Sequence, residues 1–170
     1  MSNLFNKKKK RRLGEILIDQ GVLTPEGLDN ALTKQKKEGG LLGELLLKMG
    51  LVKEEDIVVA LADQFNIPYL PVQNCDVSRS VLDLVPVDLV KKISFIPIDV
   101  IGNVLTVIMV DPLDERGRKE IEEITGMKLQ VLVGTATEIG IAVRKYYKIK
   151  DSLLSDSSFK STKNKNGDST

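Results

Sequence analysis

Residues 12–35 read RLGEILIDQGVLTPEGLDNALTKQ, and the same pattern returns almost at once. After a five-residue spacer, 36–40, residues 41–64 read LLGELLLKMGLVKEEDIVVALADQ. Nine of the 24 aligned pairs are identical, namely Leu13/Leu42, Gly14/Gly43, Glu15/Glu44, Leu17/Leu46, Gly21/Gly50, Glu26/Glu55, Ala31/Ala60, Leu32/Leu61 and Gln35/Gln64. Such a duplication predicts a pseudo-symmetric unit, which suits a partner that is itself built from two similar halves.

Each copy is expected to form two helices. The apolar residues of the first copy follow helical spacing at Leu13, Ile16 and Leu17, and again at Leu28, Ala31 and Leu32. Gly21 is typical of a helix end in the left-handed conformation, while Thr24 followed by Pro25 is typical of a helix start. The second copy repeats this arrangement. We therefore predict a four-helix unit of two similar hairpins over residues 11–66.

The rest of the chain predicts a small mixed α/β subdomain over residues 67–150, so that the whole chain is of the α+β class. Pro68 and Pro71 break the helical pattern. We expect short helices over 81–85 and 87–91, strands over 95–100, 104–110 and 129–133, and helices from Asp114 to Gly126 and from about 137 to 147. Residues 1–10 read as a disordered basic arm and residues 151–170 as a disordered tail or linker.

Composition excludes several classes of function. The net charge of +1 and an aromatic content of 4% without Trp argue against DNA or RNA as a partner. The chain has no His, a lone Cys75, no GxxxxGK[ST] phosphate loop and no nucleophile–base pair, so we predict a protein without enzyme activity, cofactor or metal. No apolar stretch approaches the roughly 20 residues that span a bilayer, and no signal peptide follows the basic start. These features fit a reducing cytoplasm.

Three polar residues of the repeat are candidates for binding. Arg12 stands at the start of a predicted helix, in the basic run that begins at Lys7. Its guanidinium could make a bidentate contact with a phosphate or a guanine edge. Gln35 and Gln64 end the apolar face of each copy, where an amide could read a base edge. The alternative remains that leucines at helical spacing form a core and that repeated glycines only end helices. From the residues alone, the repeat indicates an interaction module.

The pattern RLGxxLxxxGxLxxxxLxxALxxQ, five residues, and a second xLGxxLxxxGxVxxxxIxxALxxQ resembles the N-terminal regulatory domain of type II secretion and type IV pilus assembly ATPases, the MshEN type. The segments FNIPYLPV and LVPVDLVKKISFIPIDVIGNVLTVIMVDPLDERGRKEIEEITGMKLQVLVG resemble the second subdomain of that family. The resemblance covers about residues 11–148.

This resemblance implies that the ligand is cyclic di-GMP, which carries two guanines on a ring of two phosphates. Arg12 would contact guanine or phosphate, and Gln35 and Gln64 would contact polar groups. One apolar wall would consist of Leu13, Gly14, Leu17, Gly21, Leu28 and Leu32, and the other of Leu42, Gly43, Leu46, Gly50, Ile57 and Leu61. Asp111 would accept hydrogen bonds from guanine N1–H and N2–H.

One departure is that Leu41 stands where the second copy would repeat Arg12. Lys10, Arg11, Lys36 or Lys37 could supply the second cation. The resemblance also implies a partner, either the ATPase module or an inner-membrane platform protein. A second hypothesis is therefore a docking module that anchors a secretion ATPase to that platform protein without binding nucleotide. In both cases we expect a cytoplasmic domain, with peripheral contact to the inner membrane through the basic arm.

Overall fold

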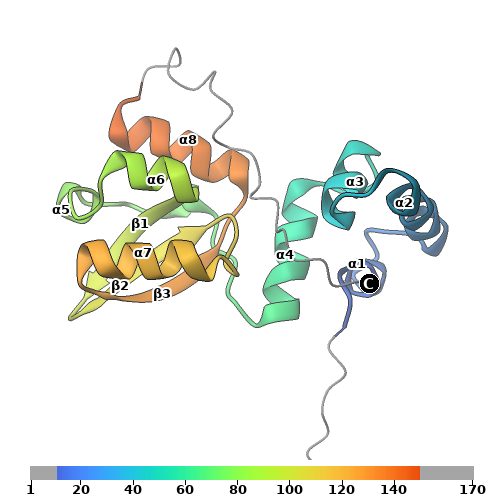
Figure 1. Ribbon diagram of the computed structural model, residues 1–170, viewed down its shortest axis with the longest axis horizontal. Coiled ribbons are helices and arrows are strands. Elements are labelled where there is room, and N and C mark those ends of the chain that lie inside the picture. Colours follow the sequence, from blue (N-terminus) through green and yellow to red (C-terminus); the bar gives the residue numbers. More distant parts are fainter. Residues whose placement is uncertain (1–10, 150–170) are drawn as a thin grey trace, which may run out of the picture. The chain divides into compact units, whose positions relative to one another are not determined.

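The computed structural model describes residues 11–149, and the chain divides into two compact units after Ile67 (Figure 1). We call the part up to Ile67 the repeat unit and the part from Pro68 the sheet unit. Each unit has its own apolar core. The predicted basic arm and the predicted tail, residues 1–10 and 151–170, lie outside the described residues.

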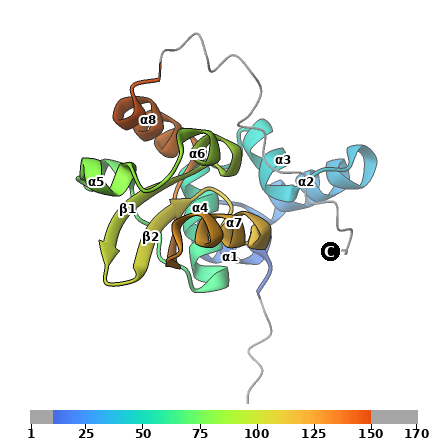
Figure 2. The same cartoon turned by 60° about the vertical axis from the view of Figure 1, so that its left-hand side comes forward.

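Four helices form the repeat unit, namely α1 (Leu13–Asp19), α2 (Pro25–Glu38), α3 (Leu42–Lys48) and α4 (Glu54–Phe65). The closest packing joins α1 with α4 and α2 with α3 (Figures 1 and 2). Each of these pairs takes one helix from either copy of the repeat. The two predicted hairpins therefore exchange helix partners, and neither copy completes its packing by itself.

Local sequence signals account for the ends of these helices. The Thr24 hydroxyl accepts a hydrogen bond from the Gly27 N–H at 3.0 Å, and Pro25 occupies the first turn, as predicted. Gly21 and Gly50 follow α1 and α3 with φ of +74° and +67°. This left-handed conformation favours glycine, so the recurring glycine marks the point where each short helix turns toward the next.

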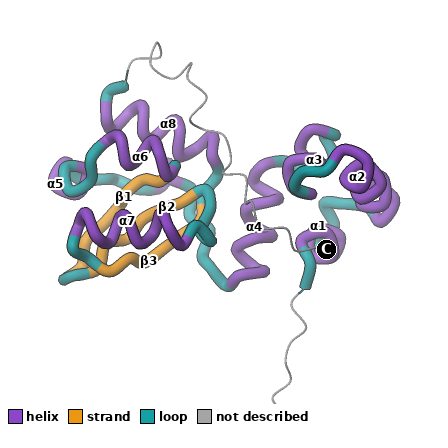
Figure 3. The backbone as a smooth tube through the Cα atoms, viewed as in Figure 1, coloured by secondary structure: helices purple, strands orange, loops and turns teal. Residues whose placement is uncertain are grey.

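The sheet unit wraps helices around a three-stranded sheet (Figure 3). In chain order it contains a 3₁₀ turn, η1 (Val72–Asn74), then α5 (Arg79–Leu82), α6 (Val87–Ile93), β1 (Phe95–Ile101), β2 (Val104–Met109), α7 (Glu115–Thr125), β3 (Lys128–Val133) and α8 (Ala136–Tyr147). Strand β2 is central, antiparallel to β1 and parallel to β3. A parallel pair needs a crossover connection, and α7 provides it.

The core of the sheet unit is mostly aliphatic, with one fully buried aromatic residue, Phe95. Phe95, Ile96, Leu105 and Ile108 of the sheet and Ile121 of α7 have no exposed surface. Helices α5, α6 and α8 pack against β1, and α7 packs against β3. The segment that enters the unit is fastened to β3, because the Val133 N–H donates to the Pro68 carbonyl at 3.0 Å.

The predicted α+β class with a mixed sheet of about three strands is confirmed. One predicted helix is displaced: α5 spans Arg79–Leu82 instead of 81–85. Pro86 accounts for the difference, because a proline disfavours helical backbone at the residue before it. No helix within residues 11–149 is long and apolar enough to cross a bilayer.

Candidate functional site at the starts of the two repeats

The two copies begin their first helices in the same way. Arg12 and Leu41 stand directly before α1 and α3 in extended conformations, with φ of −80° and −82°. The Ile16 N–H donates to the Arg12 carbonyl at 3.1 Å, and the Leu45 N–H donates to the Leu41 carbonyl at the same distance. The repeat unit is therefore pseudo-symmetric in its backbone, and it offers two equivalent helix starts.

The Arg12 side chain is exposed, and no residue within 11–149 forms an ion pair or hydrogen bond with its guanidinium. Its backbone is fixed, since the Arg12 N–H donates to a Glu15 carboxylate oxygen at 3.0 Å. A held backbone with an unpaired guanidinium suits contact with an anion or a guanine edge. Leu41, at the equivalent place, is 50% exposed and offers only apolar surface.

Gln35 and Gln64 make matching hydrogen bonds to the backbone. The Gln35 Nε2 donates to the Gly40 carbonyl at 3.0 Å, and the Gln64 Nε2 donates to the Arg11 carbonyl at 2.9 Å. Each amide thus fastens the residue that precedes the start of the other copy. Sequence reasoning missed this structural role, although the recurrence of Gln at the end of both copies was a signal for it. Within residues 11–149 no group donates to either Oε1, so both can still accept hydrogen bonds.

The glycines of the two helix starts differ in the space around them. A Cβ placed on Gly14 would lie 2.6 Å from a Leu28 methyl group, whereas the nearest atom to a Cβ on Gly43 would be an Ile57 methyl group at 3.6 Å. A side chain at position 14 would therefore displace Leu28 of α2, whereas one at position 43 would make ordinary contacts. Gly21 and Gly50, also predicted to line the ligand, occupy the helix ends described above.

The predicted apolar walls divide into core and accessible residues. Leu17 and Leu46 have no exposed surface, and Ile57 is only 9% exposed. In this structure they face the core of the repeat unit, and their contact with a ligand stays a prediction. The half-buried members, which do reach the surface, are Leu13, Leu28, Leu32, Leu42 and Leu61.

Arg11 forms two ion pairs that sequence reasoning did not foresee. Its Nη1 lies 2.9 Å from an oxygen of Asp19, and its Nη2 lies 2.8 Å from an oxygen of Asp63. All three side chains are at least half exposed. Arg11 thereby bridges the end of α1 and the end of α4, so it is a poor substitute for the cation missing at Leu41.

Asp111 lies in the sheet unit, two residues after the end of β2. Its Oδ1 accepts a hydrogen bond from the Leu113 N–H at 3.0 Å and so holds the turn that leads to α7. Asp114 begins α7 by accepting a hydrogen bond from the Gly117 N–H at 2.9 Å. The carboxylates of this turn therefore have structural roles, and a contact between Asp111 and guanine stays a prediction.

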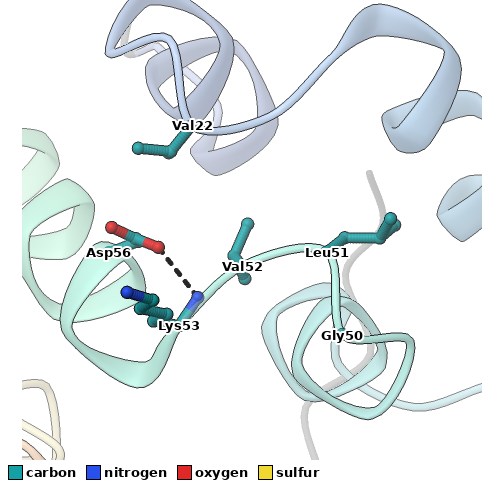
Figure 4. Close-up of a pocket in the computed structure, with 6 residues that line it drawn as sticks. All are labelled: Val22, Gly50, Leu51, Val52, Lys53 and Asp56. Carbon is teal, nitrogen blue, oxygen red and sulfur yellow. Dashed lines mark hydrogen bonds between the residues drawn. The ribbon is translucent and has the colours of Figure 1, made fainter.

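An open pocket of about 370 Å³ lies where the loops after α1 and α3 approach each other (Figure 4). Val22 faces the segment 50–53 across it, and Asp56 accepts a hydrogen bond from the Lys53 N–H at 2.8 Å. Of the predicted site residues, only Gly50 lines this pocket. It is therefore a different surface from the helix starts that carry Arg12 and Leu41.

No group of three or more metal-ligating side chains occurs within residues 11–149. Burial raises the pKa of the Cys75 thiol, which lowers its thiolate fraction and hence its reactivity at neutral pH.

Comparisons with known proteins agree on one family. The MshEN domain profile matches residues 65–153, just over half of the chain, and this match covers the sheet unit. The type IV pilus assembly ATPase PilB of Thermus thermophilus is 33% identical over 139 residues, and PilB of Myxococcus xanthus is 28% identical over 145 residues. These alignments cover 81% and 85% of this chain but only 16% and 26% of the relatives' own lengths.

Solved structures share the fold. A structure of MshE with cdg superimposes with a TM-score of 0.69 at 23% identity, covering 81% of this chain and 99% of that one. The N-terminal domain of XpsE gives a TM-score of 0.61 at 22% identity, covering 79% of this chain and 92% of that one. The profile match, the PilB relatives and the shared fold together place this chain in the MshEN domain family.

Proposed function

We propose that this chain is a non-catalytic regulatory domain that binds cyclic di-GMP for a secretion or pilus assembly ATPase in the cytoplasm. The observation that carries the proposal is the pair of equivalent helix starts in the repeat unit, with the unpaired Arg12 guanidinium at one of them. Two findings support it. The PilB relatives are pilus assembly ATPases, and the structure of MshE with the same fold contains cdg, which we take to be cyclic di-GMP.

The chemistry of the two helix starts suits a ligand with two similar halves. Arg12 would donate two hydrogen bonds to a phosphate or to guanine O6 and N7. The half-buried leucines would form an apolar floor under the bases. The free Oε1 atoms of Gln35 and Gln64 would accept guanine N–H groups. The ligand would bias the ATPase by binding one arrangement of domains more tightly than another.

Isothermal titration of the chain with cyclic di-GMP tests the proposal, with GTP, ATP and cyclic di-AMP as controls. We expect saturable binding of cyclic di-GMP alone, with micromolar or lower Kd, because two phosphates and two guanines offer many charge-assisted contacts. The absence of heat and of any shift in melting temperature at millimolar ligand would contradict the proposal.

A pair of neighbouring variants locates the site. Arg12→Ala should weaken binding by roughly tenfold or more, since a bidentate arginine contact to a base contributes about 1–3 kcal/mol. Arg11→Ala removes the same charge one residue away, but its guanidinium is held by Asp19 and Asp63, so its effect should be much smaller. Equal losses in both variants would indicate general attraction to positive charge. Circular dichroism should show that both variants remain folded.

The hydrogen bonds of Gln35 and Gln64 also favour the second candidate, a docking module that anchors a secretion ATPase to an inner-membrane platform protein. Because both amides have a structural role, their recurrence does not by itself require a nucleotide. In this case the chain would retain a platform protein's cytoplasmic segment in a pull-down that cyclic di-GMP does not change, and Arg12→Ala would leave that binding intact.

A further inference from the structure

Pseudo-symmetry relates the ion-pair cluster of Arg11 to a set of residues with opposite charge. When the two copies are aligned, Arg11 corresponds to Gly40, Asp19 to Lys48, and Asp63 to Lys34. The cation at the centre of the first cluster is thus replaced by glycine, and both surrounding acids are replaced by lysines. The second half of the repeat unit reverses the electrostatics of the first.

The geometry of the first half shows what this arrangement holds. Asp19 and Asp63 reach two nitrogens of the same guanidinium, so their positions surround one charged group. The helix pairing and the glutamine hydrogen bonds recur in the second half, because α2 packs on α3 as α1 packs on α4, and Gln35 holds Gly40 as Gln64 holds Arg11. By this symmetry, we expect Lys34 and Lys48 to lie at the places that correspond to Asp63 and Asp19.

Gly40 places no side chain where Arg11 carries its guanidinium. A Cβ on Gly40 would have no atom within 4 Å. Lys48 has no ion pair within residues 11–149, and Lys34 has only Glu38, one turn further along α2, at 3.9 Å. Two ammonium groups around an open position attract an anion, as two carboxylates around Arg11 hold a cation.

We propose that Lys34 of α2 and Lys48 at the end of α3 together bind a phosphate group. They would supply the positive charge that Leu41 lacks, since Gly40 directly precedes Leu41. This inference rests on the proposed function, because the phosphate would belong to cyclic di-GMP. Free inorganic phosphate has the same chemistry and is the alternative source. The two halves of the site would then differ, with arginine serving one phosphate and a lysine pair the other.

The test compares three substitutions that each remove one lysine charge while keeping the aliphatic stem. Lys34→Gln and Lys48→Gln should each weaken cyclic di-GMP binding, and the double variant should lose about tenfold, in line with two partly exposed ion pairs. Lys53→Gln, whose residue lines the separate pocket of Figure 4, is the matched control and should leave Kd within about twofold. Glu38→Gln should tighten binding, because it frees Lys34 from its competing carboxylate. Melting temperatures should confirm that all variants stay folded.

A second arm separates this inference from the proposed function. The amide NMR signals of Gly40 and Leu41 should shift on addition of inorganic phosphate, and the double variant should lose that shift. If phosphate produces this shift but cyclic di-GMP does not bind the wild type, the proposed function fails and the phosphate site stands. If cyclic di-GMP binds the double variant as tightly as it binds Lys53→Gln, and phosphate shifts neither amide, the lysine site is overturned and the proposed function remains.

Discussion

At the residue scale, Gly14 and Gly43 occupy equivalent positions but meet different neighbours. The methyl groups of Leu28 crowd the space beside Gly14, whereas the space beside Gly43 accommodates a further carbon at ordinary contact distance. Gly14→Ala should therefore force Leu28 out of place, and it should be about 1–3 kcal/mol less stable than Gly43→Ala. Urea unfolding of the two variants, each with the same added methyl group, measures the difference. Equal stabilities would show that Leu28 moves aside without cost.

The glutamine amides lead to a second prediction at this scale. Gln64→Ala leaves the Arg11 carbonyl without its donor, so we expect a loss of roughly 1 kcal/mol in the free energy of unfolding. Gln20→Ala is the control, since Gln20 is exposed and its side chain has no hydrogen bond within residues 11–149. If both substitutions have the same effect in thermal unfolding, the Gln64 hydrogen bond contributes nothing to stability, and Gln64 can serve a ligand alone.

At the scale of elements, the last helix is tied to the start of the sheet unit by tyrosine hydroxyls. The Tyr147 hydroxyl donates to the Leu82 carbonyl at 3.2 Å, and the Tyr146 hydroxyl donates to the Cys75 carbonyl at 3.1 Å. The pKa of Tyr147 is raised to about 12, mainly by burial. The Asp83 carboxylate also raises this pKa, and the nearby Arg79 lowers it. Helix α8 is therefore docked by a phenol that is kept neutral well into the alkaline range.

Because the pKa of Tyr147 is higher in the folded protein than its ordinary value of 10, folding favours the neutral phenol. This contribution to stability is fully present below about pH 10 and is lost as the pH rises through about 12. The difference in unfolding free energy between the wild type and Tyr147→Phe should shrink over that range. Urea titrations at several alkaline pH values measure it, together with phenolate absorbance. A difference that does not change with pH would refute the raised pKa.

Sequence patterns identified elements whose signals are local. Thr24 and Asp114 begin helices with their own side chains, and Gly126 ends α7 in the left-handed conformation, as predicted. The exchange of helix partners could not be predicted, because aligned copies show which residues match and not which helices touch. The double ion pair of Arg11 was missed for the same reason: its two acids lie 8 and 52 residues away along the chain.

The sequence predicted on which helices the candidate site residues lie, but not which of them are accessible. Helical spacing placed Leu17 and Leu28 on apolar faces, yet spacing cannot tell a core residue from one that reaches the surface. The distinction depends on the packing of α4 and α2 against those faces. The roles of Arg12, Gln35 and Gln64 toward a ligand therefore stay predictions, and the titrations described above test them.

At the scale of the whole molecule, the two separate cores predict that a substitution in one core destabilises its own unit and leaves the other unchanged. Ile16 belongs to the core of the repeat unit and Ile108 to that of the sheet unit, and both have no exposed surface. Either substitution by Ala should cost about 2–5 kcal/mol in its own unit. Hydrogen exchange followed by mass spectrometry should show faster exchange in residues 11–67 for Ile16→Ala, and in residues 68–149 for Ile108→Ala. Faster exchange across both units in either variant would show that the two cores unfold together.

The exchange of helices between the copies bears on how such a unit can diverge. Two identical peptides, each carrying one copy of the repeat, could form the same four-helix arrangement only as a homodimer. Both ends of that dimer would then be identical. Joining the copies through residues 36–40 removes this constraint. A single gene then encodes two ends that mutate independently, so one end can pair Arg11 with two acids while the other has Gly40 and two lysines at the equivalent positions.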